Sequence, residues 1–469
     1  MKILCFILPL LALLPVATSG AEKPNIILVM TDDQGWGDVG YNGHPHLKTP
    51  HLDQMHREGV TFTRFYSGAA MCSPTRGSCL TGRNPYRYGI TFAMAGMLEP
   101  TEIPITSVLK KQGYTTGHFG KWHLGTLSKE MGDQKRWGTF AKKPERYYCP
   151  PWERDVDVSF VTESKVPTWD PLVDPGPLKK KAAKKTGEPA KAYGNDYFTG
   201  PGQKVTENTK GDDSRVVMDR AIPFIQKAAR EETPFFAAVW FHTPHSPVVG
   251  GPKYRKMYQD QPEPAQHYYA CLTAMDEQVG RLRAELKSLG IADNTMVWFC
   301  SDNGPARQGS PRHVGTAKNL KGFKLSLNEG GIRVPGLLVW PAKVKKARTV
   351  NAPCFTSDYF PTIMAALGIE LPNDRIYDGV NLLPFVAGKQ TERKKPLGFL
   401  NKDGKESAWM EQRYKFISRK KGPELYDIVE DPGESKNLID EKPEIAKRIE
   451  ISLAAWRTGV ITELKSVPK

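Results

Sequence analysis

Short apolar segments that do not alternate with polar residues constrain the fold of this chain most. They are rich in β-branched and aromatic side chains, which favours strands over helices. A strand without alternation is buried on both faces, which is typical of parallel sheets covered by helices. Four such segments are residues 24–30, 235–241, 295–300 and 336–340, and a weaker one is 114–119.

Helical patterns lie between these apolar segments. In residues 276–289 the apolar side chains recur at helical spacing, and Gly290 supplies a C-terminal stop. Residues 219–229 and 357–367 are also expected to be helical, each with a proline in its early part. Alternating strands and helices predict an α/β fold with a large mixed, mostly parallel sheet flanked by helices.

The chain has 469 residues, which is more than one hydrophobic core usually spans, so a second, smaller domain is expected. We predict a C-terminal α+β domain with an antiparallel sheet around residues 396–425 and a closing helix near 443–456. The polar stretch 388–395 marks the junction. The predicted division is therefore a large domain over 22–390 and a small one over 391–469.

The N-terminus has the pattern of a secretory signal. Lys2 precedes an apolar run over residues 3–14, and small residues follow up to Ala21. The run is short for a membrane span, and an anchor that stays in place is the alternative. We expect residues 1–21 to be removed, no stable membrane insertion afterwards, and export to the periplasm or the extracellular space.

The net charge is +15 at neutral pH, and +14 without Lys2. Such a charge attracts polyanions such as acidic polysaccharides, and no nucleic-acid-binding motif is present. The densest basic run, 179–185, is either a solvated insertion loop or an arm that grips the substrate. The six cysteines after Cys5 are too few for a disulfide scaffold, and without a Cys-x-x-Cys pair they do not indicate a zinc site.

Polar residues follow several predicted strands at the point where each strand ends. Ligands of parallel α/β sheets bind beyond the carboxyl ends of the strands, so these side chains are expected to meet in one place. A single Asp or Asn could simply form a turn, but three Asp and one Asn together suit Ca²⁺ or Mg²⁺. The residues are Asp32, Asp33, Lys121, His123, His242, His245, Asp302 and Asn303.

Residues 71–83 contain a cysteine at the predicted start of a helix. Pro74 suits the first turn, which places Cys72 at the helix N-terminus, a natural anion site. Arg76, one turn further on, can fork onto an oxyanion. From these residues alone, Cys72 is either a buried structural cysteine or a reactive one, and a plain thiol nucleophile would need a nearby histidine to lower its pKa.

The motif continues as CSPTRGSCLTGR over residues 72–83. With it the chain resembles the sulfatase family, the type I, formylglycine-dependent hydrolases of the alkaline-phosphatase superfamily, and within it the arylsulfatase and N-acetylgalactosamine-6-sulfatase branches. The resemblance runs from about residue 24 to about residue 433 and implies an alkaline-phosphatase-like fold. Further matching segments are TDDQGWGD at 31–38, GKWHLG at 120–125, HTPHSP at 242–247, SDNG at 301–304 and KLSLNEGGIRVP at 324–335.

The resemblance implies that a maturation enzyme converts Cys72 to formylglycine during export, with Thr75 where the family usually has Ser. It also implies two sets of site residues: one Ca²⁺ held by Asp32, Asp33, Asp302, Asn303 and the modified Cys72, and a sulfate surrounded by Arg76, Lys121, His123, His245 and Lys324.

Two of these assignments have competing neighbours. The family's histidine precedes a residue-Pro pair, which favours His245, and His242 then either supports the site or faces the substrate. The family's lysine lies five residues before Glu-Gly-Gly, which favours Lys324 over Lys321. His242 is therefore grouped with Arg76 and the two lysines 121 and 324 as a substrate-binding candidate.

The expected reaction is hydrolysis of a sulfate ester. One hydroxyl of the hydrated formylglycine attacks sulfur and the other later drives release of sulfate, which an ordinary serine could not do. Asp302 is expected to accept the first proton, and His245 or Lys324 to protonate the leaving alcohol. His123 is expected to remove the proton of the second hydroxyl.

Export, positive charge and the resemblance favour a sulfated carbohydrate as substrate. The alternatives are a phosphomonoester or phosphonate hydrolase of the same superfamily, and a non-catalytic polyanion-binding protein. Residues 136–210 are expected to shape the leaving-group pocket. Its candidate sugar-stacking rings, which could equally be ordinary core residues, are Trp137, Tyr147, Tyr148, Trp152 and Trp169.

Overall fold

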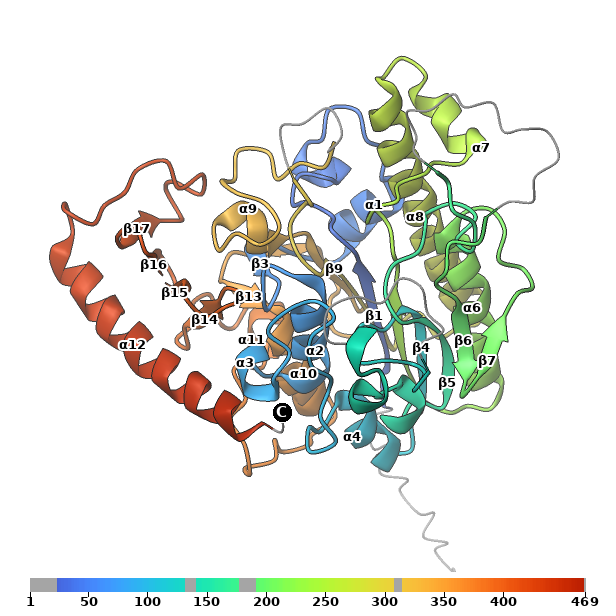
Figure 1. Cartoon of the computed structure of the whole chain (residues 1–469), viewed down its shortest axis with the longest axis horizontal. Helices are drawn as coiled ribbons and strands as arrows, with labels where there is room; N and C mark the ends of the chain where they lie inside the picture. Colours follow the sequence, from blue (N-terminus) through green and yellow to red (C-terminus); the bar gives the residue numbers. More distant parts are fainter. Residues whose placement is uncertain (1–22, 131–140, 177–190, 308–313, 468–469) are drawn as a thin grey trace, which may run out of the picture.

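The computed structural model describes residues 23–130, 141–176, 191–307 and 314–467. A mixed sheet of ten strands forms the centre, with helices on both faces, and a four-stranded antiparallel sheet lies at the C-terminal end (Figure 1). This architecture confirms the predicted α/β fold. The predicted signal segment, the basic run 179–185 and Trp137 lie outside the described residues. Within the described part of the chain, no helix is both long enough and apolar enough to cross a membrane.

The ten-stranded sheet is parallel in its central part. In spatial order its strands are β12 (Arg348–Val350), β2 (Val60–Phe62), β11 (Gly336–Val339), β9 (Thr295–Ser301), β1 (Asn25–Thr31), β8 (Phe235–Trp240), β4 (Thr115–Lys121), β5 (Val158–Thr162), β6 (Tyr197–Gly200) and β7 (Gln203–Val205). From β9 to β5 all neighbours run parallel. The carboxyl ends of these strands therefore meet at one edge of the sheet.

β11 differs from the expectation that residues 336–340 belong to the parallel set. It pairs antiparallel with both β9 and β2. All of its residues are buried, so the missing alternation reflects burial on both faces, and burial does not fix the direction of a strand.

Helices occupy the segments that the apolar periodicity indicated, with shifted boundaries. The expected helix at 276–289 is the last part of a much longer helix, and Pro223 lies in the interior of the helix expected at 219–229. The helices are α1 (Pro50–Glu58), α2 (Cys72–Thr81), α3 (Pro85–Tyr88), α4 (Ile105–Lys111), α6 (Asp213–Arg230), α7 (Pro252–Arg255), α8 (Glu263–Ser288), α9 (Glu329–Ile332), α10 (Tyr359–Ala366), α11 (Leu383–Val386) and α12 (Pro443–Ser466).

The side chains of the central strand β1 enter two hydrophobic clusters, one on each face of the sheet. Ile26, Leu28 and Met30 belong to the hydrophobic cluster that includes side chains of α2, α4 and α10. Ile27 and Val29 belong to the cluster that includes side chains of α1, α6 and α8. Successive side chains of a strand point to opposite faces, so this strand is covered by helices on both sides, as its apolar sequence predicted.

The C-terminal sheet contains β14 (Leu397–Leu400), β15 (Ser407–Met410), β16 (Tyr414–Ser418) and β17 (Glu424–Asp427). One hydrophobic cluster joins it to α12, through Phe416, Leu425 and Ile449. On the other face, Tyr66 and Phe399 belong to a cluster shared with a three-stranded sheet of β10 (Arg333–Val334), β3 (Phe65–Tyr66) and β13 (Cys354–Phe355). The small sheet is therefore packed against the large part of the molecule.

A buried ionic network also joins the two parts. The Lys415 ammonium, on β16, lies 2.9 Å from a Glu329 oxygen and 3.0 Å from a Glu434 oxygen, and all three side chains are fully buried. The Tyr66 hydroxyl donates a hydrogen bond to Glu329 at 2.9 Å, and the Glu329 backbone N–H donates to Glu434 at 2.8 Å. This network fixes α9 and the loop that precedes it against β16.

Candidate active site

Four of the polar residues at the strand ends lie close together. Asp32 and Asp33 follow β1, and Asp302 and Asn303 follow β9; all four are buried. The Asp302 backbone N–H donates to the Thr31 carbonyl at 3.1 Å, and the Asp33 backbone N–H donates to the Asp302 carboxylate at 3.1 Å. Parallel pairing of β1 with β9 thus brings the four side chains together.

Cys72 lies at the N-terminus of α2, in which every residue is buried. The helix begins at Cys72 itself, and Pro74 fits in its first turn because no helical partner is needed there for its missing N–H. The Ser73 hydroxyl donates to the His123 carbonyl, and the Thr75 hydroxyl donates to the Ala69 carbonyl at 2.9 Å. A serine at position 75 could make the same bond, so Thr75 keeps this contact.

Arg76 is fully buried and holds Asp302. Its Nη2 and Nε donate to the same Asp302 oxygen at 2.6 and 3.1 Å, and its Nη1 donates to the Lys121 carbonyl at 3.1 Å. The guanidinium was expected to fork onto the substrate's oxyanion. Because these donors are taken by the protein, its observed contacts are those of a residue that positions Asp302.

Two lysines bind the carboxylates that follow β1. The Lys121 ammonium lies 2.7 Å from an Asp32 oxygen, and the Lys324 ammonium lies 2.6 Å from an Asp33 oxygen. His245 Nε2 lies 3.7 Å from the other Asp33 oxygen. Lys321, the competing neighbour of Lys324, instead donates to the Tyr426 hydroxyl at 3.1 Å.

Burial and neighbouring charges shift the pKa values of the three carboxyl groups in opposite directions. Burial alone would raise the pKa of Asp32, but Lys121 and the other nearby cations outweigh it and hold the pKa well below its ordinary value. Burial is likewise outweighed by Lys324 at Asp33, whose pKa is lowered. Burial and the nearby Asp32 together raise the pKa of Asp302 to about 7.

The histidines and the cysteine are buried among these charges. Burial lowers the pKa of His245 to about 4 and holds the pKa of His123 well below its usual value, so both rings are neutral at pH 7. Neither ring nitrogen of His123 has a hydrogen-bond partner among the described residues. Burial raises the pKa of the Cys72 thiol, which disfavours the alternative of a plain thiolate nucleophile.

The donor set fits a hard divalent cation. Asp32, Asp302 and Cys72 each offer a ligand atom, and these atoms all lie within 4.8 Å of one another. Asp32 Oδ1 and Asn303 Oδ1 are buried, and neither oxygen accepts a hydrogen bond from any residue in the described ranges. Buried oxygens without donors are costly unless something else satisfies them, and carboxylate and amide oxygens are preferred ligands of Ca²⁺.

Comparison with known protein families agrees with this geometry. The model of the family described as Sulfatase matches residues 24–369. This chain belongs to the sulfatase family. It is accordingly a sulfuric ester hydrolase. A second model, described as the C-terminal part of N-sulphoglucosamine sulphohydrolase, matches residues 323–458 of this sulfatase.

Known relatives cover most of the chain. N-acetylgalactosamine-6-sulfatase of Mus musculus is 31% identical over an alignment of 409 residues, and the match covers 82% of this sulfatase and 71% of the relative. Steryl-sulfatase of Rattus norvegicus is 32% identical over 427 residues, covering 78% and 70%. A crystal structure of Ps i-CgsB has a TM-score of 0.79 at 25% identity and covers 93% of each chain; it has also been solved in complex with k-i-k-neocarrahexaose.

A cavity of about 300 Å³ opens beside Cys72 in this sulfatase. Of the predicted site residues, Cys72, Lys121, His123, His245 and Lys324 line it. Sequence reasoning missed several further lining residues, namely Phe92, Met94, Ser164, Lys165, Leu325 and Lys402. Ser164 and Lys165 follow β5, so the rule that ligands bind at strand ends could have found them.

His242 does not line this cavity, which corrects its assignment as a substrate-binding residue. The side chain is fully buried, its Nδ1 lies 2.9 Å from an Asp213 oxygen, and its Nε2 lies 2.6 Å from the Thr162 hydroxyl. Both ring nitrogens are therefore used inside the protein, which agrees with a supporting role.

The candidate sugar-stacking rings at 147, 148, 152 and 169 also lie away from the cavity. Trp152 donates to the Tyr148 hydroxyl at 3.2 Å, and the ring of Trp169 lies against Gly251. Trp152 and Trp169 therefore pack against neighbouring residues, which was the ordinary alternative, whereas Tyr147 lines a different cavity.

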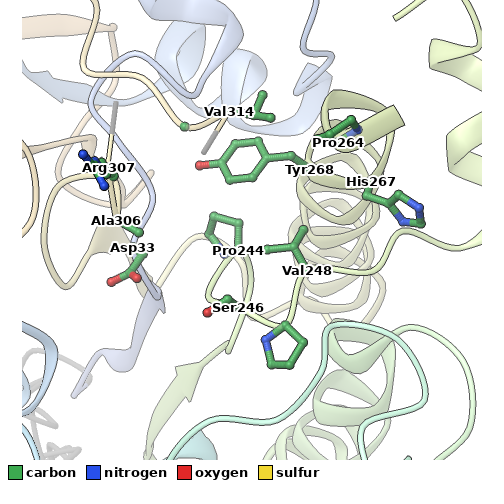
Figure 2. A pocket seen from close by; sticks show the side chains of 12 residues that line it. Asp33, Pro244, Ser246, Val248, Pro264, His267, Tyr268, Ala306, Arg307 and Val314 are labelled. Atoms are coloured by element: carbon green, nitrogen blue, oxygen red, sulfur yellow. The ribbon is translucent and has the colours of Figure 1, made fainter. Parts of the chain in front are cut away.

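Asp33 lines a second cavity, of about 230 Å³. Figure 2 shows Tyr268 and His267 of α8 on one side of it and Asp33 and Arg307 on the other. Pro244 and Ser246 line this cavity, whereas His245 between them lines the cavity beside Cys72.

Proposed function

We propose that this sulfatase hydrolyses sulfate esters of a carbohydrate, with a formylglycine at position 72 and one Ca²⁺. The observation that carries the proposal is the position of Cys72, at a buried helix N-terminus within 4.8 Å of carboxylate oxygens of Asp32 and Asp302. The N-acetylgalactosamine-6-sulfatase relative and the Ps i-CgsB complex with an oligosaccharide support a carbohydrate as substrate.

The proposed cofactors supply the chemistry that the unmodified chain lacks. Asp32, Asp33, Asp302 and Asn303 would hold Ca²⁺, which offsets the negative charge of the sulfate when bound. Formylglycine at position 72, once hydrated, offers two hydroxyls on one carbon, one for attack on sulfur and one for release of sulfate. A maturation enzyme would convert Cys72 during export to the periplasm or the extracellular space.

The chain's own lysines orient and stabilise the sulfate. The ammonium groups of Lys121 and Lys324 line the cavity and are fixed by Asp32 and Asp33. Fixed cations beside the reacting group stabilise charge that develops in the transition state without reorganising. Arg76 contributes through Asp302, whose carboxylate it holds in place.

Proton transfers are assigned to residues that line or adjoin the cavity. We assign Asp302 as the acceptor of the attacking hydroxyl's proton, and Lys324 or His245 as the donor to the leaving alcohol. Lys324 carries a proton at pH 7, whereas the neutral His245 ring would first have to take one up. His123 would take the proton of the second hydroxyl through one of its ring nitrogens, since neither is engaged by any other described residue.

Replacement of Cys72 tests the proposal. Cys72→Ala should abolish release of sulfate from 4-nitrophenyl sulfate while thermal unfolding stays near that of the wild type. Cys79→Ala is the matched control, because Cys79 is buried in the same helix but does not line the cavity. Near-normal sulfate release by Cys72→Ala would refute the nucleophile assignment.

Three further measurements complete the test. Mass spectrometry of the natively secreted protein should show that the peptide containing residue 72 is lighter than its cysteine form and reacts with carbonyl reagents. Chelation should lower the activity and added Ca²⁺ should restore it; full activity after exhaustive metal removal would count against the cation site. Faster hydrolysis of 4-nitrophenyl phosphate than of the sulfate would favour the phosphoester alternative.

A further inference from the structure

We propose that the substrate carries a second anionic group near the sulfate ester, and that Lys165 and Lys402 bind it. The proposal rests on the proposed carbohydrate sulfatase activity and defines its substrate class further. The second group is a carboxylate of a uronic acid or another sulfate, which both present anionic oxygens. The argument depends on the charges that line the cavity beside Cys72.

The cavity is lined by four lysines and, among the residues that the structure describes, by no aspartate or glutamate. Lys121 forms an ion pair with Asp32 at 2.7 Å, and Lys324 forms one with Asp33 at 2.6 Å. Lys165 and Lys402 form no ion pair within the described ranges. A ligand with a single negative charge would therefore leave uncompensated cations in the cavity.

Lys165 is half-buried beside the predicted sulfate site. Burial lowers the pKa of its ammonium, and the nearby Lys121 and Lys324 lower it further. Its backbone is held in place, because the Asn195 side chain donates to the Lys165 carbonyl at 2.8 Å. A cation in this position is destabilised until an anion binds. A second anionic group on the ligand would therefore contribute more binding free energy here than at an exposed lysine.

Lys402 reaches the cavity from the small C-terminal sheet. It lies in the turn between β14 and β15, and its ammonium lies 5.4 Å from the centre of the Phe92 ring, which also lines the cavity. The turn is fixed because the Tyr86 hydroxyl donates to the Asn401 carbonyl at 2.6 Å and the Gly404 N–H donates to it at 3.0 Å. The nearby carboxylate of Asp403 lies 3.6 Å from Lys405 instead.

The two lysines come from different parts of the fold, one after β5 of the large sheet and one from the small sheet. Their convergence on a cavity that already contains Cys72 is not needed to hold the sulfate ester itself. It is explained if they select a substrate with a further anionic substituent.

The test compares matched substrates and variants. The substrates are a disulfated disaccharide, a monosulfated disaccharide containing a uronic acid, a monosulfated neutral disaccharide and 4-nitrophenyl sulfate. A hydrogen bond to a charged group is worth about 1.5–3 kcal/mol, which corresponds to a tenfold or greater change. Lys165→Gln and Lys402→Ala should each lower kcat/KM about tenfold on one or both dianionic disaccharides, mainly through KM, and change it less than about threefold on 4-nitrophenyl sulfate.

Two controls separate this role from a structural one. Lys405→Ala, in the same turn but outside the cavity, should leave every kcat/KM near the wild-type value. Lys165→Arg should recover most of the loss of Lys165→Gln, because it restores the charge. The dianionic disaccharide whose kcat/KM falls most in the lysine variants identifies the second group as carboxylate or sulfate.

Binding distinguishes failure of this proposal from failure of the proposed activity. Calorimetry with the Cys72→Ala variant, which requires no turnover, should show tighter binding of a dianionic disaccharide than of the neutral monosulfated one, and the difference should disappear in Cys72→Ala/Lys165→Gln/Lys402→Ala. Equal binding of all disaccharides, or equal loss of kcat/KM on every substrate in the lysine variants, would overturn the proposal. Absence of hydrolysis with normal discrimination in binding would instead refute only the proposed activity.

Discussion

Replacing Lys415 by methionine should destabilise the protein strongly, because it removes the only cation that contacts both Glu329 and Glu434 in the described part of the chain. Methionine has a similar volume, so the change mainly removes charge. The two carboxylates would remain fully buried and close together. Breaking a buried ionic network by removing one partner costs about 3–5 kcal/mol, since an uncompensated charge is left behind.

The loss should depend on pH. Without Lys415, burial and mutual repulsion raise the folded-state pKa of the glutamate pair above its unfolded value. A raised carboxyl pKa gives stability that is present at low pH and lost as the pH rises through the folded-state value. The deficit of Lys415→Met relative to the wild type should therefore be larger at pH 7.5 than at pH 5.

Urea unfolding followed by tryptophan fluorescence measures the effect, because Trp409 and Trp456 contact each other between β15 and α12. The triple variant Lys415→Met/Glu329→Gln/Glu434→Gln should recover much of the lost free energy, since neither buried carboxylate is then left without the Lys415 ammonium. Lys436→Met is the exposed control: its ion pair with Glu441, at 2.8 Å, is solvated and should contribute less than about 0.5 kcal/mol. A loss below about 1 kcal/mol at pH 7.5, or an equal loss at pH 5, would refute the reasoning.

Three other substitutions have expected outcomes. Gly120→Ala should lower both stability and activity. Gly120 has φ 101°, and a Cβ there would lie 2.0 Å from the Trp240 carbonyl oxygen. An unchanged melting temperature would contradict this prediction. Burial raises the pKa of Asp276 from 3.8 to about 7. The unfolding free energy of the wild type should therefore fall by about 2–4 kcal/mol between pH 4 and pH 8, and this fall should be absent in Asp276→Asn. Parallel pH profiles of the two proteins would contradict this prediction. Arg76→Lys keeps the charge but cannot donate two hydrogen bonds to Asp302 in the same geometry. The rate of sulfate release should therefore fall at least about tenfold, while the circular dichroism spectrum stays unchanged. Wild-type turnover would contradict the positioning role.

Much of the fold and of the site could be predicted because two simple rules applied. The apolar runs gave the central parallel strands, and the rule that ligands bind at strand ends brought Asp32, Asp33, Asp302 and Asn303 together. The direction of β11 could not be predicted, because burial on both faces is compatible with either direction.

Other features depend on contacts between residues far apart in the sequence. Arg76 was expected to contact the substrate, but its donors are used by Asp302, which is more than two hundred residues away. His242 was grouped with the substrate-binding candidates as one of two possible roles, but Asp213 and Thr162 engage both of its ring nitrogens. Lys402 lies in a turn of the small sheet, and its spacing in the sequence gives no indication that it lines the cavity beside Cys72.

The ionic network around Lys415 bears on how this enzyme could be shortened or recombined. The loop that carries Lys324 leads directly into α9, and α9 is held by a cation that belongs to β16. A version ending before the small sheet would remove the Lys415 ammonium from Glu329 and leave Arg333, at 3.5 Å, as its cation, which would loosen the segment next to the reaction centre. Chimaeras between relatives should therefore exchange residues 321–334 and the C-terminal sheet as a single block.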